Sequence, residues 1–301
     1  MPELPDIVVY IEALKARLLN EVLQGARIAS LFVLRSVAPP VTDFTGLQVR
    51  AIHRLGKQIV LEFEGEHFLV IHLMIAGRLQ WKASGAPVPG KVGLAAFDFE
   101  NGTLILTEAG SKKRASIHAV KGREALASFD RKALEVLDSN HDAFASVLRC
   151  ENHTLKRSLT DPRLFSGIGN AYSDEILHRA RLSPMKQTGK LSVEEVRRLW
   201  ESTRAVLREW TERLRGETGA DFPSKVTAFR PEMAVHGRFG LPCPACGSPV
   251  QRIVYAQNEC NYCAACQTEG RLLADRAMSR LLKEDWPRSL DELEKHFEAR
   301  R

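Results

Sequence analysis

Residues 243–246 read Cys-Pro-Ala-Cys, and residues 263–266 read Cys-Ala-Ala-Cys. Each motif presents two thiolates at one turn, and the 16 residues between the motifs suffice for a short hairpin. Two such motifs at this spacing are typical of a single tetrahedral zinc site. We therefore predict one structural Zn²⁺, which stabilises the hairpin and performs no chemistry, held by Cys243, Cys246, Cys263 and Cys266.

A fifth cysteine, Cys260, lies between the two motifs and leaves the ligand set open, because Cys260 and Cys263 also form a Cys-x-x-Cys motif. We prefer Cys263 and Cys266 as the second pair, since that choice keeps the longer spacer. Cys260 is then a small buried or partly exposed side chain. Five of the six cysteines crowd into positions 243–266, which favours metal binding over disulfides in a reducing compartment.

Upstream of the cysteines, the hydrophobic pattern divides the chain into two halves. Residues 6–19 carry an apolar stripe at helical spacing, and residues from about 26 to 120 alternate as short strands. The strongest turn signal is Asn101-Gly102 between two alternating runs, which predicts a β-hairpin. The spacing becomes helical from about residue 123, and the predicted helices cover 126–148, 154–164, 170–181 and 193–214. An antiparallel β-domain with an N-terminal helix thus precedes a helical domain.

The composition is that of an ordinary globular protein. Of 301 residues, 44% are hydrophobic and 27% are charged, so the chain can bury a core and form more than one domain. Lys and Arg number 43 against 37 Asp and Glu, which gives a net charge of +6. This balance permits nucleic acid binding without proving it. No signal peptide and no run of about 18 apolar residues is visible, so we expect a cytoplasmic protein without a membrane partner.

The first residues, Met1-Pro2-Glu3, place a proline where removal of Met1 leaves a free secondary amine beside a carboxylate. An α-amino group titrates near about 8 and a lysine amine near about 10.4, so a terminal amine is the more available nucleophile at neutral pH. Its condensation with a sugar C1′ gives an iminium, which is an electron sink. Proline at position two also occurs simply because it permits methionine removal, so the rest of the chain must decide.

Pro2-Glu3-Leu4-Pro5, Lys57 at a strand start, the turn Gly167-Ile168-Gly169-Asn170 and the last cysteine motif with Gln267 occur in one order. Together they resemble the Fpg/Nei family of DNA glycosylases, which excise oxidised bases and nick the abasic site. The match covers about residues 2–267. It implies an α+β multidomain fold: an N-terminal antiparallel β-sandwich with an N-terminal helix, a helix–two-turn–helix domain and a C-terminal zinc-finger β-hairpin with a helical tail, with DNA in the cleft between the domains.

On this basis we expect four domains in chain order. The predicted ranges are 2–125 for the catalytic β-sandwich domain, 126–235 for the helical domain, 236–269 for the zinc finger and 270–301 for a helical C-terminal extension. The extension continues beyond where relatives commonly end. It carries apolar residues at helical spacing from Leu272 to Leu282 and a break at Trp286-Pro287, and we expect it to pack on the zinc finger or the helical domain.

The resemblance also implies roles for matching residues. Pro2 would attack C1′ of the damaged nucleotide and form a Schiff base, and Glu3 would act as general acid/base on the sugar. Lys57 would lie near the lesion and its phosphates, while Lys156 and Asn170 would hold the flanking phosphates. A Gly-x-Gly turn at a helix N-terminus suits the last role, because its backbone N–H groups can approach an anion. The damaged base must leave the duplex for this chemistry.

The sequence departs from the family pattern at the DNA-reading positions. Asn258 stands where the zinc hairpin normally carries an arginine, and a neutral amide lacks the charged bidentate fork. Arg252 or Arg271 could compensate. Asp6 replaces the more usual glutamate near the nucleophile.

A second departure concerns the residues that fill the space of the extruded base. Residues 111–115 read Ser-Lys-Lys-Arg-Ala in place of Pro-Arg-Arg-Phe-Gly, and Ile75 falls at the usual methionine wedge. Lys113 and Arg114 either reach the orphaned base or follow the phosphates, and the sequence does not decide between these readings.

We therefore predict a bifunctional DNA glycosylase/AP lyase of base excision repair, which acts on oxidised or ring-opened bases and cleaves the strand by β,δ-elimination. The alternative is a damaged-DNA-binding protein of the same fold with weak or no glycosylase activity, as Asn258 and the altered wedge suggest. A zinc-ribbon nucleic-acid module unrelated to repair would leave Pro2-Glu3 unexplained. We further expect a monomer, bound to double-stranded DNA with a damaged base or abasic site, in the bacterial cytoplasm at the nucleoid.

Overall fold

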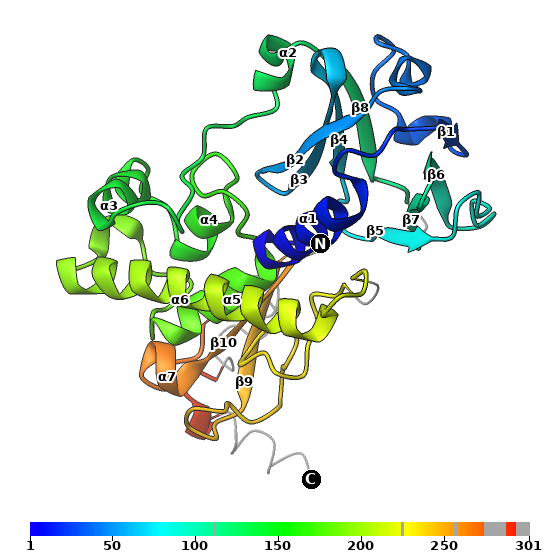
Figure 1. Cartoon of the computed structure of the whole chain (residues 1–301). Helices are drawn as coiled ribbons and strands as arrows, with labels where there is room; N and C mark the ends of the chain where they lie inside the picture. The colour runs from blue at the N-terminus through cyan, green and yellow to red at the C-terminus, as the bar shows by residue number, and fades with distance from the viewer. Residues whose placement is uncertain (111, 224–225, 256–257, 274–286, 293–301) are drawn as a thin grey trace. The chain divides into compact units, whose positions relative to one another are not determined.

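The computed structural model describes the chain except residues 111, 224–225, 256–257, 274–286 and 293–301. The chain folds into two compact units (Figure 1). The first contains Met1–Ala133 and Arg208–Ala228, and the second contains Leu134–Leu207 and Phe229–Arg301. Each unit thus draws on two stretches of sequence, whereas the predicted domain ranges are continuous.

The first unit opens with helix α1 (Leu4–Leu18), which agrees with the helix predicted over 6–19. The helix begins at Leu4 because Glu3 and Asp6 form a reciprocal capping box. The backbone N–H of Glu3 donates to Asp6 Oδ2 at 3.0 Å. One face of α1, which includes Ile7, Tyr10 and Leu14, is fully buried, so the capped end and the N-terminal residues are anchored to the core.

Two antiparallel four-stranded sheets, with strand orders β1-β6-β7-β5 and β2-β3-β4-β8, form the body of the first unit. The strands are β1 (Gly25–Ile28), β2 (Val49–Leu55), β3 (Gln58–Phe63), β4 (His67–His72), β5 (Gly77–Lys82), β6 (Gly93–Phe99), β7 (Gly102–Glu108) and β8 (Ser116–Lys121). One apolar cluster takes side chains from both sheets and from α1, for example Leu61, Leu106 and Leu14. The sheets therefore pack face to face, and the predicted β-sandwich is confirmed.

The β6–β7 hairpin confirms the turn signal with a shift of one residue. Phe99 pairs with Gly102, so Glu100 and Asn101 form the turn and Gly102 already belongs to β7. A Cβ at Gly102 would lie 2.2 Å from Cζ2 of Trp81. Glycine is needed here for the close approach of the Trp81 ring, and not for the dihedral angles of the turn.

The single helix predicted over 126–148 is wrong. Helix α2 (Arg123–Ala127) ends in the first unit, and α3 (His141–Arg149) begins in the second. Asn140 starts α3, because its side chain accepts the N–H of Ala143 at 2.8 Å. Between the two helices, the backbone of Leu134 bonds to Leu164 and Ser166 instead of to its own helical neighbours.

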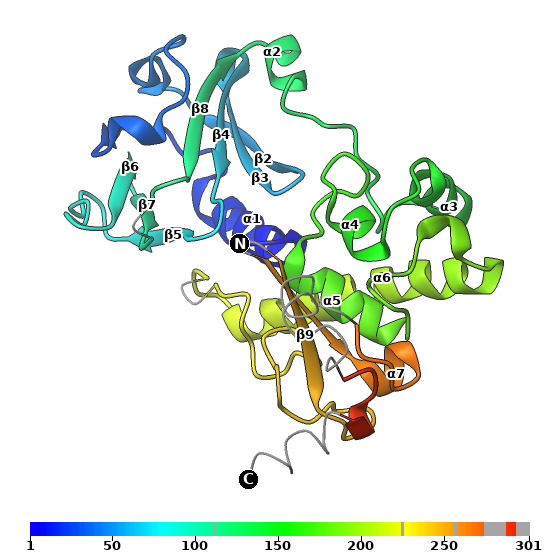
Figure 2. The same cartoon turned by 180° about the vertical axis from the view of Figure 1, so that it is seen from behind.

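The second unit contains α3 and three further helices, α4 (Leu155–Thr160), α5 (Asn170–Arg179) and the first part of α6 (Val193–Thr218). A two-stranded antiparallel hairpin follows, made of β9 (Val250–Tyr255) and β10 (Asn258–Cys263), and it leads into α7 (Ala264–Thr268). Helix α5 packs against β10 (Figure 1), and Figure 2 shows the same region from behind, with β9 of the hairpin labelled. Short 3₁₀ helices cover Leu31–Val33, Val41–Phe44, Glu64–Glu66 and Thr188–Lys190.

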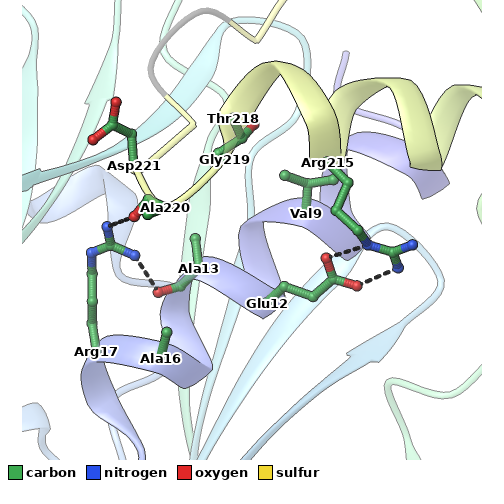
Figure 3. Close-up of a pocket in the computed structure, with 10 residues that line it drawn as sticks. All are labelled: Val9, Glu12, Ala13, Ala16, Arg17, Arg215, Thr218, Gly219, Ala220 and Asp221. Atoms are coloured by element: carbon green, nitrogen blue, oxygen red, sulfur yellow. Dashed lines mark hydrogen bonds and ion pairs between the residues drawn. The ribbon is translucent and has the colours of Figure 1, made fainter.

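The end of α6 belongs to the first unit because its side chains form ion pairs and hydrogen bonds with α1. Arg215 forms a bidentate ion pair with Glu12, with N–O distances of 2.5 and 2.8 Å. Arg17 donates to the carbonyls of Ala13 and Ala220, each at 2.9 Å. Figure 3 shows these contacts around a cavity of about 150 Å³. The helix thus crosses from one compact unit to the other, which explains why the units do not follow chain order.

The described parts of the C-terminal extension pack on the cysteine hairpin. Leu272 is buried with Ile253 and Tyr262, and Leu290 packs against the same cluster. The backbone N–H of Leu272 donates to Arg288 at 2.9 Å. The helical spacing predicted from Leu272 to Leu282 falls mainly on residues 274–286, outside the described residues. Within the described part of the chain, no helix is long and apolar enough to cross a membrane.

Candidate functional site

The N-terminal residues are held inside the first unit. Pro2 is buried, and Glu3 is only 2% exposed. Glu3 ends the extended segment at the N-terminus of α1, where its carboxylate accepts the N–H of Asp6. The Asp6 carboxylate in turn accepts the N–H of Glu3, so the shorter aspartate side chain still completes the capping box. The Glu3 carboxylate therefore lies at the positive end of the α1 dipole, on the residue next to Pro2.

Four charged side chains act on the N-terminal amine. Burial lowers the pKa of the Met1 ammonium, and the positive charges of Arg78 and Lys57 lower it further. Glu3 and Asp6 oppose this effect. Lys57, predicted at a strand start, lies in the turn between β2 and β3, one residue before β3 begins at Gln58. The structure therefore brings together three predicted site residues, Pro2, Glu3 and Lys57.

A basic group lies around the end of β4 in the same unit. Burial lowers the pKa of His72 to about 4, and the charges of Lys57 and Arg131 act in the same direction. Sequence reasoning did not select His72 or Arg131. The sequence around His72 does not indicate which residues lie near it, because Lys57 comes from the β2–β3 turn and Arg131 from the loop after α2.

The predicted wedge residue Ile75 is at the tip of the β4–β5 loop and is 56% exposed. The loop is tight, because Gly77 N–H bonds to Leu73 O at 2.9 Å and Met74 adopts a left-handed conformation with φ of 52°. An exposed isoleucine on a tight loop is free to enter an apolar space such as that between bases.

Lys113 and Arg114 are exposed residues before β8. The buried carboxylate of Glu108 fixes their backbone by accepting the N–H of Arg114 at 2.8 Å and of Ala115 at 3.0 Å. The Lys113 ammonium bonds to the carbonyl of Glu108. The loop therefore has a defined anchor, although its role toward DNA stays a prediction.

In the second unit, the turn Gly167-Ile168-Gly169 leads into α5 at Asn170. Gly167 has φ of +79°, a conformation that favours glycine, and Gly169 precedes the first helical residue. The Asn170 side chain donates to the carbonyl of Glu259 in β10 at 2.8 Å. The α5 N-terminus and the hairpin are thus joined at Asn170, next to the backbone of Asn258, whose side chain lies outside the description.

Lys156 is buried, and its ammonium donates hydrogen bonds to three acceptors. Its Nζ donates to Asp174 Oδ1 at 2.6 Å, to the Asn170 carbonyl at 2.7 Å and to Ser173 Oγ at 2.8 Å. An ammonium has three N–H donors, and these three bonds match that number. In this structure Lys156 braces the start of α5, so a direct phosphate contact by Lys156 stays a prediction that its burial does not favour.

Asp174 is the centre of this buried network and was not selected from the sequence. It is fully buried, and its Oδ2 accepts from His236 Nδ1 at 2.8 Å and from the N–H of Asn261 at 3.2 Å. The neighbouring Glu175 accepts three backbone N–H groups of residues 234–236, and burial raises its pKa. These two carboxylates tie α4, α5, the segment 234–236 and β10 together.

The two proposed substitutes for the missing arginine differ in position. Arg252 is on β9, with its guanidinium 3.5 Å from Glu259 and 4.3 Å from the centre of the Phe239 ring. Arg271 is exposed just beyond α7. Glu259 partly neutralises the charge of Arg252. Neither arginine occupies position 258, where the family pattern has an arginine and this chain has asparagine.

The four predicted zinc ligands come together. Their Sγ atoms all lie within 4.8 Å of one another, with 4.0 Å between Cys243 and Cys266 and 3.4 Å between Cys246 and Cys263. A ZnS₄ tetrahedron with bonds of about 2.3 Å has edges of about 3.8 Å, so these four thiols fit Zn²⁺. His178 Nε2 lies 3.2 Å from Cys243 Sγ and is placed to support that ligand from outside.

Cys260 does not belong to the cluster. It is buried on β10, and burial together with Asp174 raises the pKa of its thiol well above the ordinary value. Among the described residues, the side chains that lie close enough to hold one metal ion are the other four cysteines of this region. The four cysteines of the preferred set are the ones that lie close enough to hold a metal ion, whereas Cys260 lies beside Asp174.

This combination defines a class of proteins with a β-sandwich, a helix–two-turn–helix unit and a four-cysteine hairpin. Residues 1–112 match the formamidopyrimidine-DNA glycosylase N-terminal domain, and residues 133–220 match the formamidopyrimidine-DNA glycosylase H2TH domain. A formamidopyrimidine-DNA glycosylase of Thermus thermophilus is 33% identical over 285 residues, which cover 90% of this chain and 100% of the relative. The chain belongs to the formamidopyrimidine-DNA glycosylase family, as its motifs predict.

Three further similarities accompany this assignment. An uncharacterized formamidopyrimidine-DNA glycosylase-like protein of Mycobacterium tuberculosis is 42% identical over 149 residues, which cover 50% of this chain and 92% of that protein. A crystal structure of the LlFpg protein in complex with THF-DNA and an inhibitor aligns with a TM-score of 0.79 at 25% identity, over 89% of this chain and 100% of that one. The Lactococcus lactis Fpg bound to DNA with an abasic site shares the fold, with a TM-score of 0.79 at 23% identity over 88% of this chain and 99% of that one.

Proposed function

We propose that this protein is a bifunctional DNA glycosylase/AP lyase that excises oxidised or ring-opened bases through the amine of Pro2. The observation that carries the proposal is the burial of Pro2 and Glu3 at the start of α1, among the charges of Asp6, Lys57 and Arg78. Membership of the family and the names of its relatives support the substrate class.

The proposed chemistry starts from the chain without Met1. The Pro2 nitrogen lone pair forms a bond to C1′ of the extruded nucleotide, and the glycosidic bond breaks with its electron pair leaving on the base. The Glu3 carboxylate takes the proton that the Pro2 nitrogen loses and gives it to the ring oxygen, so that the bond between C1′ and the ring oxygen breaks and a C1′=N iminium forms, while the departing base takes a proton from water. Loss of a proton from C2′ then expels the 3′ phosphate, and a second elimination expels the 5′ phosphate. The iminium accepts the electrons at each step.

The other predicted residues would bind the DNA. Lys57 would neutralise a phosphate near the lesion, and Ile75 would fill the space that the extruded base leaves. Asn170 and the backbone N–H groups of the Gly167–Gly169 turn would hold a flanking phosphate. Zn²⁺, the metal that the four cysteines suit, would have the structural role of holding the hairpin. We propose further that the protein acts as a monomer in the bacterial cytoplasm.

Replacement of Glu3 by glutamine is expected to lower strand cleavage at an abasic site by roughly 10²- to 10⁴-fold, because the general acid/base is lost while the shape is kept. The measurement is single-turnover cleavage of an end-labelled duplex with one abasic site, resolved on a denaturing gel. Replacement of the exposed Glu100 by glutamine is the matched control and keeps wild-type rates. Equal cleavage by the Glu3 and Glu100 variants would contradict the assigned role.

The same assay separates the two functions weighed from the sequence. A protein that binds the abasic duplex tightly but leaves it intact is the damaged-DNA-binding protein. The absence of arginine at position 258 is the observation that favours this reading.

The rate of Schiff-base formation is expected to rise with pH and to level off with a midpoint below about 8, the ordinary value for an α-amine. Burial lowers the pKa of the Met1 amine, and we expect burial to act in the same direction on the Pro2 amine after Met1 is removed, so its neutral, nucleophilic form persists to lower pH than in a peptide. The rate rises with pH because protonation of the amine removes the lone pair that attacks C1′. The measurement is the initial rate of borohydride-trapped adduct at saturating DNA across the pH range, and a midpoint above 8 would contradict it.

A further inference from the structure

The guanidinium of Arg78 joins two segments of the first unit that are far apart in sequence. Arg78 is the second residue of β5. Its Nε donates to the carbonyl of Val226 at 2.6 Å, across 148 positions of the chain. Its Nη1 donates to the carbonyls of Gly77 at 2.7 Å and Ile75 at 3.2 Å. One side chain thus binds both the β4–β5 loop and the segment that follows α6.

Both segments have further anchors close to the N-terminus. The Phe222 ring lies 5.7 Å from the ring of Tyr10 on α1, and Val226 is part of the same apolar core as Tyr10. On the other side, a Cβ at Gly77 would lie 2.2 Å from the carbonyl oxygen of Leu73, so the loop that carries Ile75 is already closed tightly. Arg78 therefore connects two parts of the unit, each of which has a further contact of its own.

Arg78 also supplies a fixed charge. It is one of four charged groups that act on the amine of Met1, with Glu3, Asp6 and Lys57, and removal of Met1 moves the terminal amine by one residue, to Pro2. An arginine keeps its charge at every accessible pH. Its hydrogen bonds go to neutral carbonyls and not to a carboxylate, so the positive charge is not cancelled by these partners.

We propose that Arg78 is a positioning residue of the N-terminal site, which fixes the Ile75 loop and the Val226 carbonyl beside the amine and keeps a positive charge next to it. This inference rests on the proposed function of Pro2. The two parts of the role can be separated, because lysine keeps the charge but lacks the planar fork, whereas methionine lacks both.

The test compares Arg78→Met and Arg78→Lys in single-turnover borohydride trapping on a duplex with one abasic site, at saturating DNA and across the pH range. Arg27→Met is the matched control. Arg27 is on the same sheet and also donates to a loop carbonyl, that of Ala86 at 2.7 Å, but it is not among the charges that act on the N-terminal amine.

Arg78→Met is expected to lower the plateau rate by roughly 10- to 100-fold, as a small misplacement of reacting groups does. It should also move the midpoint of the pH profile upward by roughly half a pH unit, because a positive charge near the amine is lost. Arg78→Lys should lower the plateau but keep the midpoint. Arg27→Met should change neither.

Wild-type plateau and midpoint in Arg78→Met would overturn the inference, and so would an equal upward shift of the midpoint in Arg78→Lys. If Arg78→Met does not fold, the lysine variant carries the test alone, since its plateau must fall while its midpoint stays. A wild-type protein that forms no adduct would instead remove the proposed function, and this inference with it. A wild-type adduct with unaffected Arg78 variants would remove the inference only.

Discussion

Replacement of Asp174 by alanine is expected to lower the free energy of unfolding by about 3–5 kcal/mol. Asp174 is fully buried, and its carboxylate is the charged partner of Lys156, which is itself 3% exposed. Removal of the carboxylate leaves a buried ammonium without its counter-charge and takes an acceptor from His236 and from the N–H of Asn261. A loss of this size is a large part of the total stability of a typical domain.

Chemical denaturation followed by a probe in the second unit measures this loss. The exposed pair Arg50–Glu64 provides the comparison, because Glu64→Gln should leave the free energy of unfolding nearly unchanged. The double variant Asp174→Asn/Lys156→Met removes both charges and should recover part of the stability. A loss below 1 kcal/mol for Asp174→Ala would show that the buried pair does not hold the second unit together.

Removal of the metal is expected to unfold the cysteine hairpin while the first unit keeps its structure. Structural zinc contributes on the order of 10–16 kcal/mol to small zinc-binding peptides. Here the hairpin core is formed by the ligands themselves, because Cys243 and Cys263 are buried with Val235 and Val250. A strong chelator should therefore abolish hydrogen-exchange protection of the β9–β10 amides and leave that of β3 and β4 unchanged.

Two single variants locate the metal. Cys263→Ser should lose the bound zinc, whereas Cys260→Ser should keep one zinc per chain by elemental analysis. Loss of zinc from Cys260→Ser, or protected hairpin amides after complete chelation, would contradict the assigned ligand set and its structural role.

Several features were predictable from the sequence because they depend on local chemistry. The cysteine spacing selected the four residues whose Sγ atoms lie within 4.8 Å of one another. The apolar stripe predicted α1 to within two residues at its start and one at its end. Alternation around Asn101 predicted the β6–β7 hairpin, since a strand pattern on both sides of a turn requires no distant partner.

Other features depend on partners far apart in the sequence and were not predictable. The spacing predicts one helix through residues 128–140, but Leu134 pairs with the segment around Leu164. The resemblance implies that Lys156 holds a phosphate, yet Asp174 and the start of α5 surround its ammonium. Arg78 carries no local sign that it binds Val226. In each case a long-range hydrogen bond decides what a local pattern leaves open.

The central claim is that the amine of residue 2 is the nucleophile, and borohydride trapping with peptide mapping tests it most directly. The purified chain, with removal of Met1 verified by intact mass, is incubated with a duplex that contains one abasic site, reduced with borohydride and digested. The account predicts one covalent adduct per chain, with the reduced deoxyribose on the peptide that begins at Pro2. An adduct on a lysine side chain such as that of Lys57, or no adduct at a DNA concentration that saturates binding, would contradict it.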